Sequence, residues 1–407
     1  MAAKWDAILE GRETVRTAQV LKNWYTLKCS NFATPSSFFT THEYFAPVDI
    51  IRKKNVTLLR VSETEAVFSE LDPTMNLLDV RKHPIFFIPQ TYQCRRIIRI
   101  PRWAFQQAVD KIDITDRRVV WMFNTQRCGS TTWAQIFSAL PNWTVLSEPQ
   151  VFYQSIVNGY SGNDIPLFTE TKEFEAMLTG IIKFYVSMAP PGGSVLWKTM
   201  PVDEPMLKVV PKLFPEHKLT FTYRNVLTNA GSYHQCYMRW PLVLNYIRHL
   251  EIDPFNKNPT GQLRVARLVY NNGFDVELCA KAIEESKLKA VVFEWFVLKW
   301  AAKIRAVLDA KAEGIEIKPV KYEFLLKDLR KSVTQLFEYL EVSADLIPKA
   351  LAAASADSLA GTFISRDAKA RNTRWNRTTD GVNRCNKVLE IFGLPDLDTD
   401  YVMDGSI

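Results

Sequence analysis

The pattern of hydrophobic and polar positions divides the chain near residue 115. Residues 1–115, here called the N-terminal extension, carry short apolar runs that prolines interrupt. These runs predict helices at residues 6–22 and 103–112, and short strands at 56–61, 85–88 and 96–100. No motif in the extension indicates what it does, so its role stays open.

Residues 116–407 alternate between strand and helix patterns, which is typical of an α/β domain. Continuous apolar runs predict buried parallel strands at residues 119–123, 194–197, 219–223 and 315–322. Apolar residues at helical spacing predict amphipathic helices at 174–185 and 293–308. We therefore expect a three-layer sandwich, in which helices cover both faces of a central parallel sheet.

Composition and charge narrow the class of protein. Of the 407 residues, 47% are hydrophobic and 23% are charged, which excludes a disordered or coiled-coil chain. The net charge of +7 favours an anionic small molecule over nucleic acid as partner. The six cysteines form no CxxC pair, so no zinc site is expected. Because no signal peptide and no apolar run of about 20 residues occurs, we expect a cytoplasmic protein without a membrane span.

A polar loop after the strand at 119–123 indicates an anion site. The loop and the start of the next helix combine a cation, a glycine and three hydroxyls, in the order Arg127, Cys128, Gly129, Ser130, Thr131 and Thr132. The N–H groups at a helix N-terminus attract anions, a glycine allows close approach, and arginine adds a guanidinium fork. We interpret this loop as a phosphate site; the alternative is that Ser130 only caps the helix. The GxxxxGK[ST] pattern is absent, which disfavours a magnesium-dependent ATP or GTP enzyme.

A second cationic motif follows the strand at 219–223. Arg224 stands at the carboxyl end of that strand, where open α/β sheets bind their ligands, and Ser232 follows eight residues later. Arg224 alone could be an ordinary surface ion pair. Together the two motifs predict a ligand with two phosphates, held at two strand ends.

These motifs resemble the two cofactor motifs of the sulfotransferase family, whose members use 3′-phosphoadenosine-5′-phosphosulfate (PAPS). The loop at Arg127 resembles the family's 5′-phosphosulfate loop, and Arg224 with Ser232 resembles its 3′-phosphate motif. Residues 320–340 and 365–385 also resemble family segments, the latter those of carbohydrate-type members. The resemblance covers about residues 117–395 and implies a P-loop-containing nucleotide-binding fold.

The resemblance also implies roles for single residues. Residues 127–132 would hold the 5′-phosphosulfate, Arg224 and Ser232 would hold the 3′-phosphate, and Lys198 would touch the sulfuryl group. Glu323 is expected to tie a loop to a backbone N–H. An in-line transfer of this kind requires positioning and charge stabilisation, and no metal is expected.

The general base departs from the commonest family pattern. Met200 occupies the place of the histidine that serves as base in cytosolic small-molecule members. Carbohydrate-type and bacterial glycolipid-type members use a glutamate after the first helix, and Glu148 matches it, so Glu148 is the predicted base. Two alternatives remain: Glu148 supports the cap of a following helix, or His234 is the base.

The sequence thus predicts an enzyme that moves a sulfuryl group from PAPS to a hydroxyl or amine of a small-molecule or glycoside acceptor. Residues 152–168 and 233–259, rich in Tyr and Trp, are expected to line the acceptor pocket. A P-loop nucleotide kinase-like enzyme and a non-catalytic nucleotide-binding scaffold on the same fold remain as alternatives. The acceptor itself and the oligomeric state, for which a homodimer is one option, are not determined by the sequence.

Overall fold

In the computed structural model, the chain divides into two compact units. Unit 1 comprises residues 1–119 and 141–200, and unit 2 comprises residues 120–140 and 201–407. The structure describes residues 17–27, 37–152, 155, 172–200, 203, 206–237, 276–288, 292–356 and 375–407. The predicted boundary near residue 115 stays a prediction.

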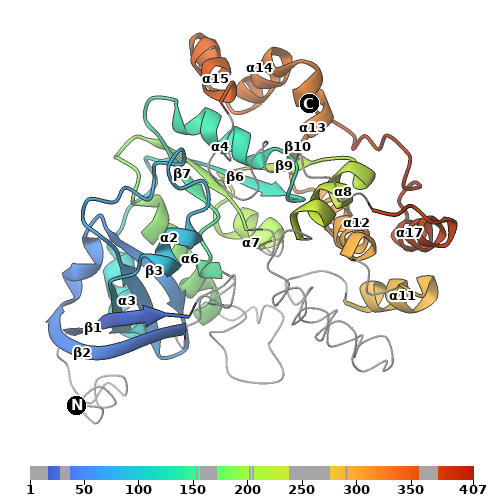
Figure 1. Ribbon diagram of the computed structural model, residues 1–407. Coiled ribbons are helices and arrows are strands. Elements are labelled where there is room, and N and C mark those ends of the chain that lie inside the picture. Colours follow the sequence, from blue (N-terminus) through green and yellow to red (C-terminus); the bar gives the residue numbers. More distant parts are fainter. Residues whose placement is uncertain are drawn as a thin grey trace. The chain divides into compact units, whose positions relative to one another are not determined.

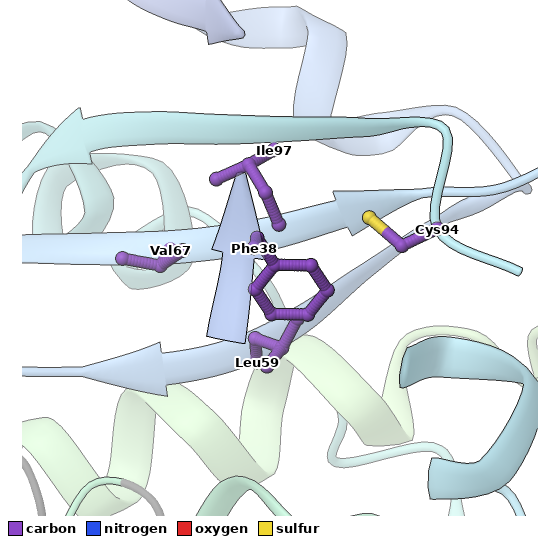
Figure 2. Close-up of a cluster of buried hydrophobic side chains, with 5 residues drawn as sticks. All are labelled: Phe38, Leu59, Val67, Cys94 and Ile97. Atoms are coloured by element: carbon purple, nitrogen blue, oxygen red, sulfur yellow. The ribbon is translucent and has the colours of Figure 1, made fainter. Parts of the chain in front are cut away.

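The N-terminal extension folds around an antiparallel five-stranded sheet of order β2-β1-β5-β4-β3. The strands are β1 (Thr17–Thr26), β2 (Phe38–Pro47), β3 (Val56–Val61), β4 (Glu65–Glu70) and β5 (Arg96–Pro101). Its helical elements are η2 (Val48–Arg52), α2 (Phe87–Tyr92) and α3 (Arg102–Asp110). Side chains from four strands and from the residue Cys94 close one buried cluster, shown in Figure 2: Phe38, Leu59, Val67, Cys94 and Ile97. The predicted strands at 56–61 and 96–100 and the predicted helix at 103–112 are confirmed.

Two predictions for the extension are wrong. Residues 17–22 lie in β1 rather than in a helix, because β1 pairs with β2 on one side and β5 on the other, and this pairing overrides the local pattern. Residues 1–16 lie outside the described part. Residues 85–88 form no strand; helix α2 begins at Phe87 and accommodates Pro89 in its first turn, where proline is tolerated.

A second five-stranded sheet has the order β10-β9-β6-β8-β7. Its strands are β6 (Arg118–Asn124), β7 (Trp143–Ser147), β8 (Ser194–Lys198), β9 (Lys218–Tyr223) and β10 (Ile317–Lys321). Strand β9 pairs in parallel with both β6 and β10, and β7 pairs in parallel with β8. This sheet confirms the predicted α/β class and the four predicted strands; β7 was not predicted.

Helices connect the parallel strands, as the alternating pattern predicts (Figure 1). In unit 1 this helix is α6 (Lys172–Val186). In unit 2 the connecting helices are α4 (Ser130–Ser138), α7 (Met206–Leu213), α8 (Val226–Tyr237), α11 (Val276–Ser286) and α12 (Val292–Ala312). After β10, the last strand, come α13 (Tyr322–Lys327), α14 (Leu329–Tyr339), η4 (Ala344–Leu346), α15 (Ile347–Ala354) and α17 (Thr379–Ile391). Helix α12 packs against α8, and α4 against α15. Among the helices that the structure describes, none has both the length and the apolar character that a membrane crossing requires.

Candidate anion-binding site

The first predicted loop joins β6 to α4, as the sequence pattern requires. Strand β6 is almost entirely buried and ends at Asn124, and α4 begins at Ser130. Gly129, which has no side chain, occupies the N-cap position with φ 83°, and Ser130 is the first residue inside the helix. The alternative in which the Ser130 hydroxyl caps α4 is therefore wrong, and the N-terminus of α4 keeps the positive end of its dipole toward the loop.

Two non-glycine residues of this loop adopt the left-handed backbone conformation: Gln126 has φ 59° and Arg127 has φ 48°. Each such residue costs about 1–3 kcal/mol and persists where the surrounding structure holds it. The Asn124 side chain accepts the N–H of Gln126 at 2.9 Å, and the N–H of Thr125 donates to the Thr222 carbonyl at 3.0 Å. The loop is therefore held in a strained conformation by β6 and β9.

Gly129 is required sterically as well as by its φ. A Cβ atom at this position would lie 2.5 and 2.7 Å from two ring carbons of Tyr322. The same ring also lies beside Arg224, whose guanidinium carbon is 4.9 Å from the ring centroid. Tyr322, the first residue of α13, thus packs against both predicted anion motifs, and sequence reasoning missed it.

The two motifs meet through a side-chain hydrogen bond. Arg127 Nε donates to Ser232 Oγ at 3.2 Å, although the residues are 105 positions apart. Ser232 lies on α8, the helix that follows β9. The hydroxyl of Ser232 still has its own O–H to donate, and the guanidinium carries further N–H groups, so the pair can present several donors to one anion.

Arg224 is a half-buried cation at the carboxyl end of β9. Its Nε donates to Thr228 Oγ1 at 2.9 Å, and Glu323 Oε1 lies 3.8 Å away. The pKa of Arg224 is lowered by burial, against which Tyr322 and Glu323 act, and the positive charge of Arg127 lowers it further. Arg224 is thus held at the strand end by Thr228, by Glu323 and by the Tyr322 ring.

A network behind Arg224 fixes the start of α8. Glu323 accepts the backbone N–H of Asn225 at 3.1 Å, which confirms the expected contact of Glu323 with a backbone N–H. The Asn225 side chain donates to Asp400 Oδ1 at 2.7 Å, and the buried Lys321 ammonium donates to the same oxygen. These hydrogen bonds lower the pKa of Asp400, and the one from Lys321 has the larger effect. Asp400 carries no sequence signal that could have revealed this contact.

The predicted base and the predicted sulfuryl contact form an ion pair within unit 1. Lys198 Nζ lies 2.6 Å from Glu148 Oε1, and the Glu148 N–H donates to the Lys198 carbonyl at 2.9 Å. The side chain of Lys198 is 1% exposed and that of Glu148 is 15% exposed, so Lys198 is not a surface lysine. Glu148 also has a left-handed backbone, with φ 62°.

The remaining predicted site residues are placed as follows. Cys128 is fully buried and Thr131 and Thr132 are half-buried in the first turn of α4. Burial lowers the pKa of His234, the alternative base, on α8. The predicted acceptor segments 152–168 and 233–259 lie mostly outside the described residues. In the described ranges, no group of three or more His, Cys, Asp or Glu side chains could hold a metal ion.

No protein-family model and no curated protein sequence matches the chain. The solved structures that are similar to it include two sulfotransferases. One, from Alicyclobacillus acidocaldarius, has a TM-score of 0.30 and 14% identity over 63% of this chain and 97% of its own. The other, from Mycobacterium avium, has a TM-score of 0.36 and 12% identity over 72% of this chain and 79% of its own.

Proposed function

We propose that the chain is a PAPS-dependent sulfotransferase that acts on a hydroxyl or amine of a small-molecule or glycoside acceptor. The observation that carries the proposal is the convergence of the two anion motifs. Two contacts support this convergence: Arg127 donates to Ser232, and the Tyr322 ring lies beside both Arg224 and the position that a Cβ would take at Gly129. A ligand with a single phosphate would need only one of these motifs.

The chemistry of the donors fits the two anionic groups of such a nucleotide. Guanidinium forks, hydroxyls and the N-terminus of a helix are the donors that phosphate oxygens accept from most strongly. Arg127 and the start of α4 would hold the 5′-phosphosulfate, and Arg224 with Ser232 would hold the 3′-phosphate. The Tyr322 ring lies beside the Arg224 guanidinium, whose carbon is 4.9 Å from the ring centroid, and beside Gly129 of the first motif.

In the proposed reaction, the acceptor oxygen forms a bond to sulfur while the bond from sulfur to the oxygen of the 5′-phosphate breaks. Glu148 takes the proton of the acceptor hydroxyl, and Arg127 neutralises the charge that develops on the departing phosphate. Lys198 orients the Glu148 carboxylate through their 2.6 Å ion pair and supplies positive charge for the sulfuryl oxygens. These roles of Glu148 and Lys198 are part of the proposal.

Isothermal titration with adenosine 3′,5′-bisphosphate tests the cofactor assignment. We expect the bisphosphate to bind much more tightly than ATP, with no dependence on magnesium. A charge-assisted hydrogen bond contributes about 1.5–3 kcal/mol, so Arg224→Ala should weaken the bisphosphate about tenfold or more. The exposed Arg330 provides the control, because Arg330→Ala removes the same charge from the surface of α14.

Three results would contradict this proposal. Equal affinity for ATP and the bisphosphate would favour the kinase alternative, and unchanged affinity in Arg224→Ala would remove that residue from the site. Bisphosphate binding without turnover of labelled PAPS across a broad set of acceptors would favour the non-catalytic scaffold. The same acceptor screen identifies the substrate class if turnover occurs.

A further inference from the structure

Asn229 connects the two anion motifs at a second point. It lies on α8, five residues after Arg224 and three before Ser232. Its Nδ2 donates to the Gln126 carbonyl at 2.7 Å and to Thr125 Oγ1 at 3.2 Å. Asn229 is only 1% exposed, so its amide donates hydrogen bonds to the loop rather than to solvent.

The Gln126 carbonyl, which accepts the hydrogen bond from Asn229, is important because of its place in the loop backbone. The carbonyl of Gln126 belongs to the same peptide plane as the N–H of Arg127, because a peptide group is rigid. Fixing the direction of that carbonyl therefore fixes ψ of Gln126 and φ of Arg127. Both residues hold left-handed conformations that a freed loop would leave. Asn229 thus controls the backbone from which the Arg127 side chain projects.

Ser232 acts on the same arginine one helical turn later. Residues three apart on a helix share a face, so Asn229 and Ser232 can both contact the loop. Asn229 holds the backbone of the Gln126–Arg127 peptide, and Ser232 accepts from the guanidinium. One face of α8 therefore sets both the position and the direction of Arg127.

We propose that Asn229 is a positioning residue. From α8, the helix of the second phosphate site, it holds the loop of the first site so that the Arg127 guanidinium can bind the 5′-phosphate group. The inference rests on the proposed function and adds a residue and a coupling to it. Asn229 carries no charge and acts through Arg127. Its loss should therefore weaken recognition of the 5′-phosphate and spare that of the 3′-phosphate, because Arg224 and Ser232, the residues proposed to hold the 3′-phosphate, lie outside the loop.

Titrations with adenosine 5′-phosphate, adenosine 3′-phosphate and the 3′,5′-bisphosphate test this. In Asn229→Ala we expect about a tenfold loss for the 5′-phosphate and the bisphosphate, and less than about a twofold loss for the 3′-phosphate. In an Arg127→Ala background, Asn229→Ala should cause no further loss, because residues that act as one unit are not additive. Asn229→Leu keeps a similar volume and adds no charge but removes the donors; it should reproduce the loss, and it decides the question if the alanine variant does not fold.

Asn386 provides a matched control. Its side chain accepts the Leu397 N–H at 2.9 Å, away from either motif, so Asn386→Ala should lower stability and leave all three affinities unchanged. Equal losses for the two monophosphates, additive losses with Arg127→Ala, or unchanged affinities would each overturn the inference. Failure of the proposed function is visible separately, because the wild-type chain would then not prefer the bisphosphate over ATP; in that case both fall.

Discussion

Gly129→Ala is the sharpest test of how the loop and α13 fit together. The substitution acts in two ways that the structure separates. The residue has φ 83°, a conformation that costs a residue with a Cβ about 1–2 kcal/mol. The new Cβ would also lie 2.5 and 2.7 Å from carbons of the Tyr322 ring, closer than such atoms pack, so the ring must move. Overpacking of this kind costs about 1–3 kcal/mol, which gives about 2–5 kcal/mol in total.

Two reference substitutions divide this total into its parts. Gly314 has φ 88°, and among the described residues, its chain neighbours aside, no atom lies within 4 Å of the position that a Cβ would take there. Gly314→Ala therefore measures the backbone cost alone. In a Tyr322→Ala background the clash at Gly129 is absent, and Gly129→Ala should cost only about 1–2 kcal/mol. The free energy of unfolding, from urea titrations followed by tryptophan fluorescence, provides the comparison.

The same variant should also weaken ligand binding. A displaced Tyr322 ring no longer supports the Arg224 guanidinium, which lies 4.9 Å from the ring centroid. We expect Gly129→Ala to lower the affinity for adenosine 3′,5′-bisphosphate and Gly314→Ala to leave it unchanged. If Gly129→Ala costs the same stability with and without Tyr322, within about 0.5 kcal/mol, the ring does not limit the space at Gly129 and the reasoning is refuted.

Two further predictions concern proton transfer and acid stability. Glu148→Gln should lower turnover about 100-fold or more and leave bisphosphate affinity unchanged, because it removes the proposed base; near-normal turnover would place the base elsewhere. Burial lowers the pKa of His217 from 6.5 to about 4, and its Nδ1 accepts from Trp121 at 3.2 Å, which needs the neutral ring. The unfolded chain therefore binds a proton that the fold excludes, so this stabilisation is complete above the unfolded pKa and declines as the pH falls toward about 4. Between about pH 7.5 and about pH 4.5, urea titrations should show the wild type losing about 2–3 kcal/mol more than His217→Gln; equal losses would contradict it.

The central sheet could be predicted because burial on both faces leaves a simple pattern. Strand β6 reads as an uninterrupted apolar run and is buried along nearly its whole length. The hairpin of β1 and β2 leaves no such pattern. Its pairing shifts register between Val20 and Leu21 and again between Asn23 and Tyr25, and several of its side chains are exposed. Each irregularity breaks the alternation of faces on which strand prediction depends.

The places of Arg127 and Arg224 after the ends of β6 and β9 were also predictable, because strand ends and motif spacing are properties of the sequence. The side chains that orient these two arginines could not be predicted. Asn229 contacts a loop 103 residues away, and Asn225 contacts Asp400 at a separation of 175. Tyr322 occupies its place through packing on Gly129. Contacts at such separations depend on how the sheet is assembled, and single residues of common type carry no sign of them.

Backbone strain explains why the candidate site residues depend on partners that are distant in the sequence. Among the described residues, six non-glycine positions have positive φ, and three of them are Gln126, Arg127 and Glu148. Strained positions persist only where tertiary contacts over-determine them. Such contacts are visible at all three: Asn229 holds the Gln126–Arg127 peptide, and the Lys198 carbonyl accepts the Glu148 N–H. The direction of each candidate side chain is therefore set by a distant partner, and substitutions of those partners should alter ligand recognition more than they alter the free energy of unfolding.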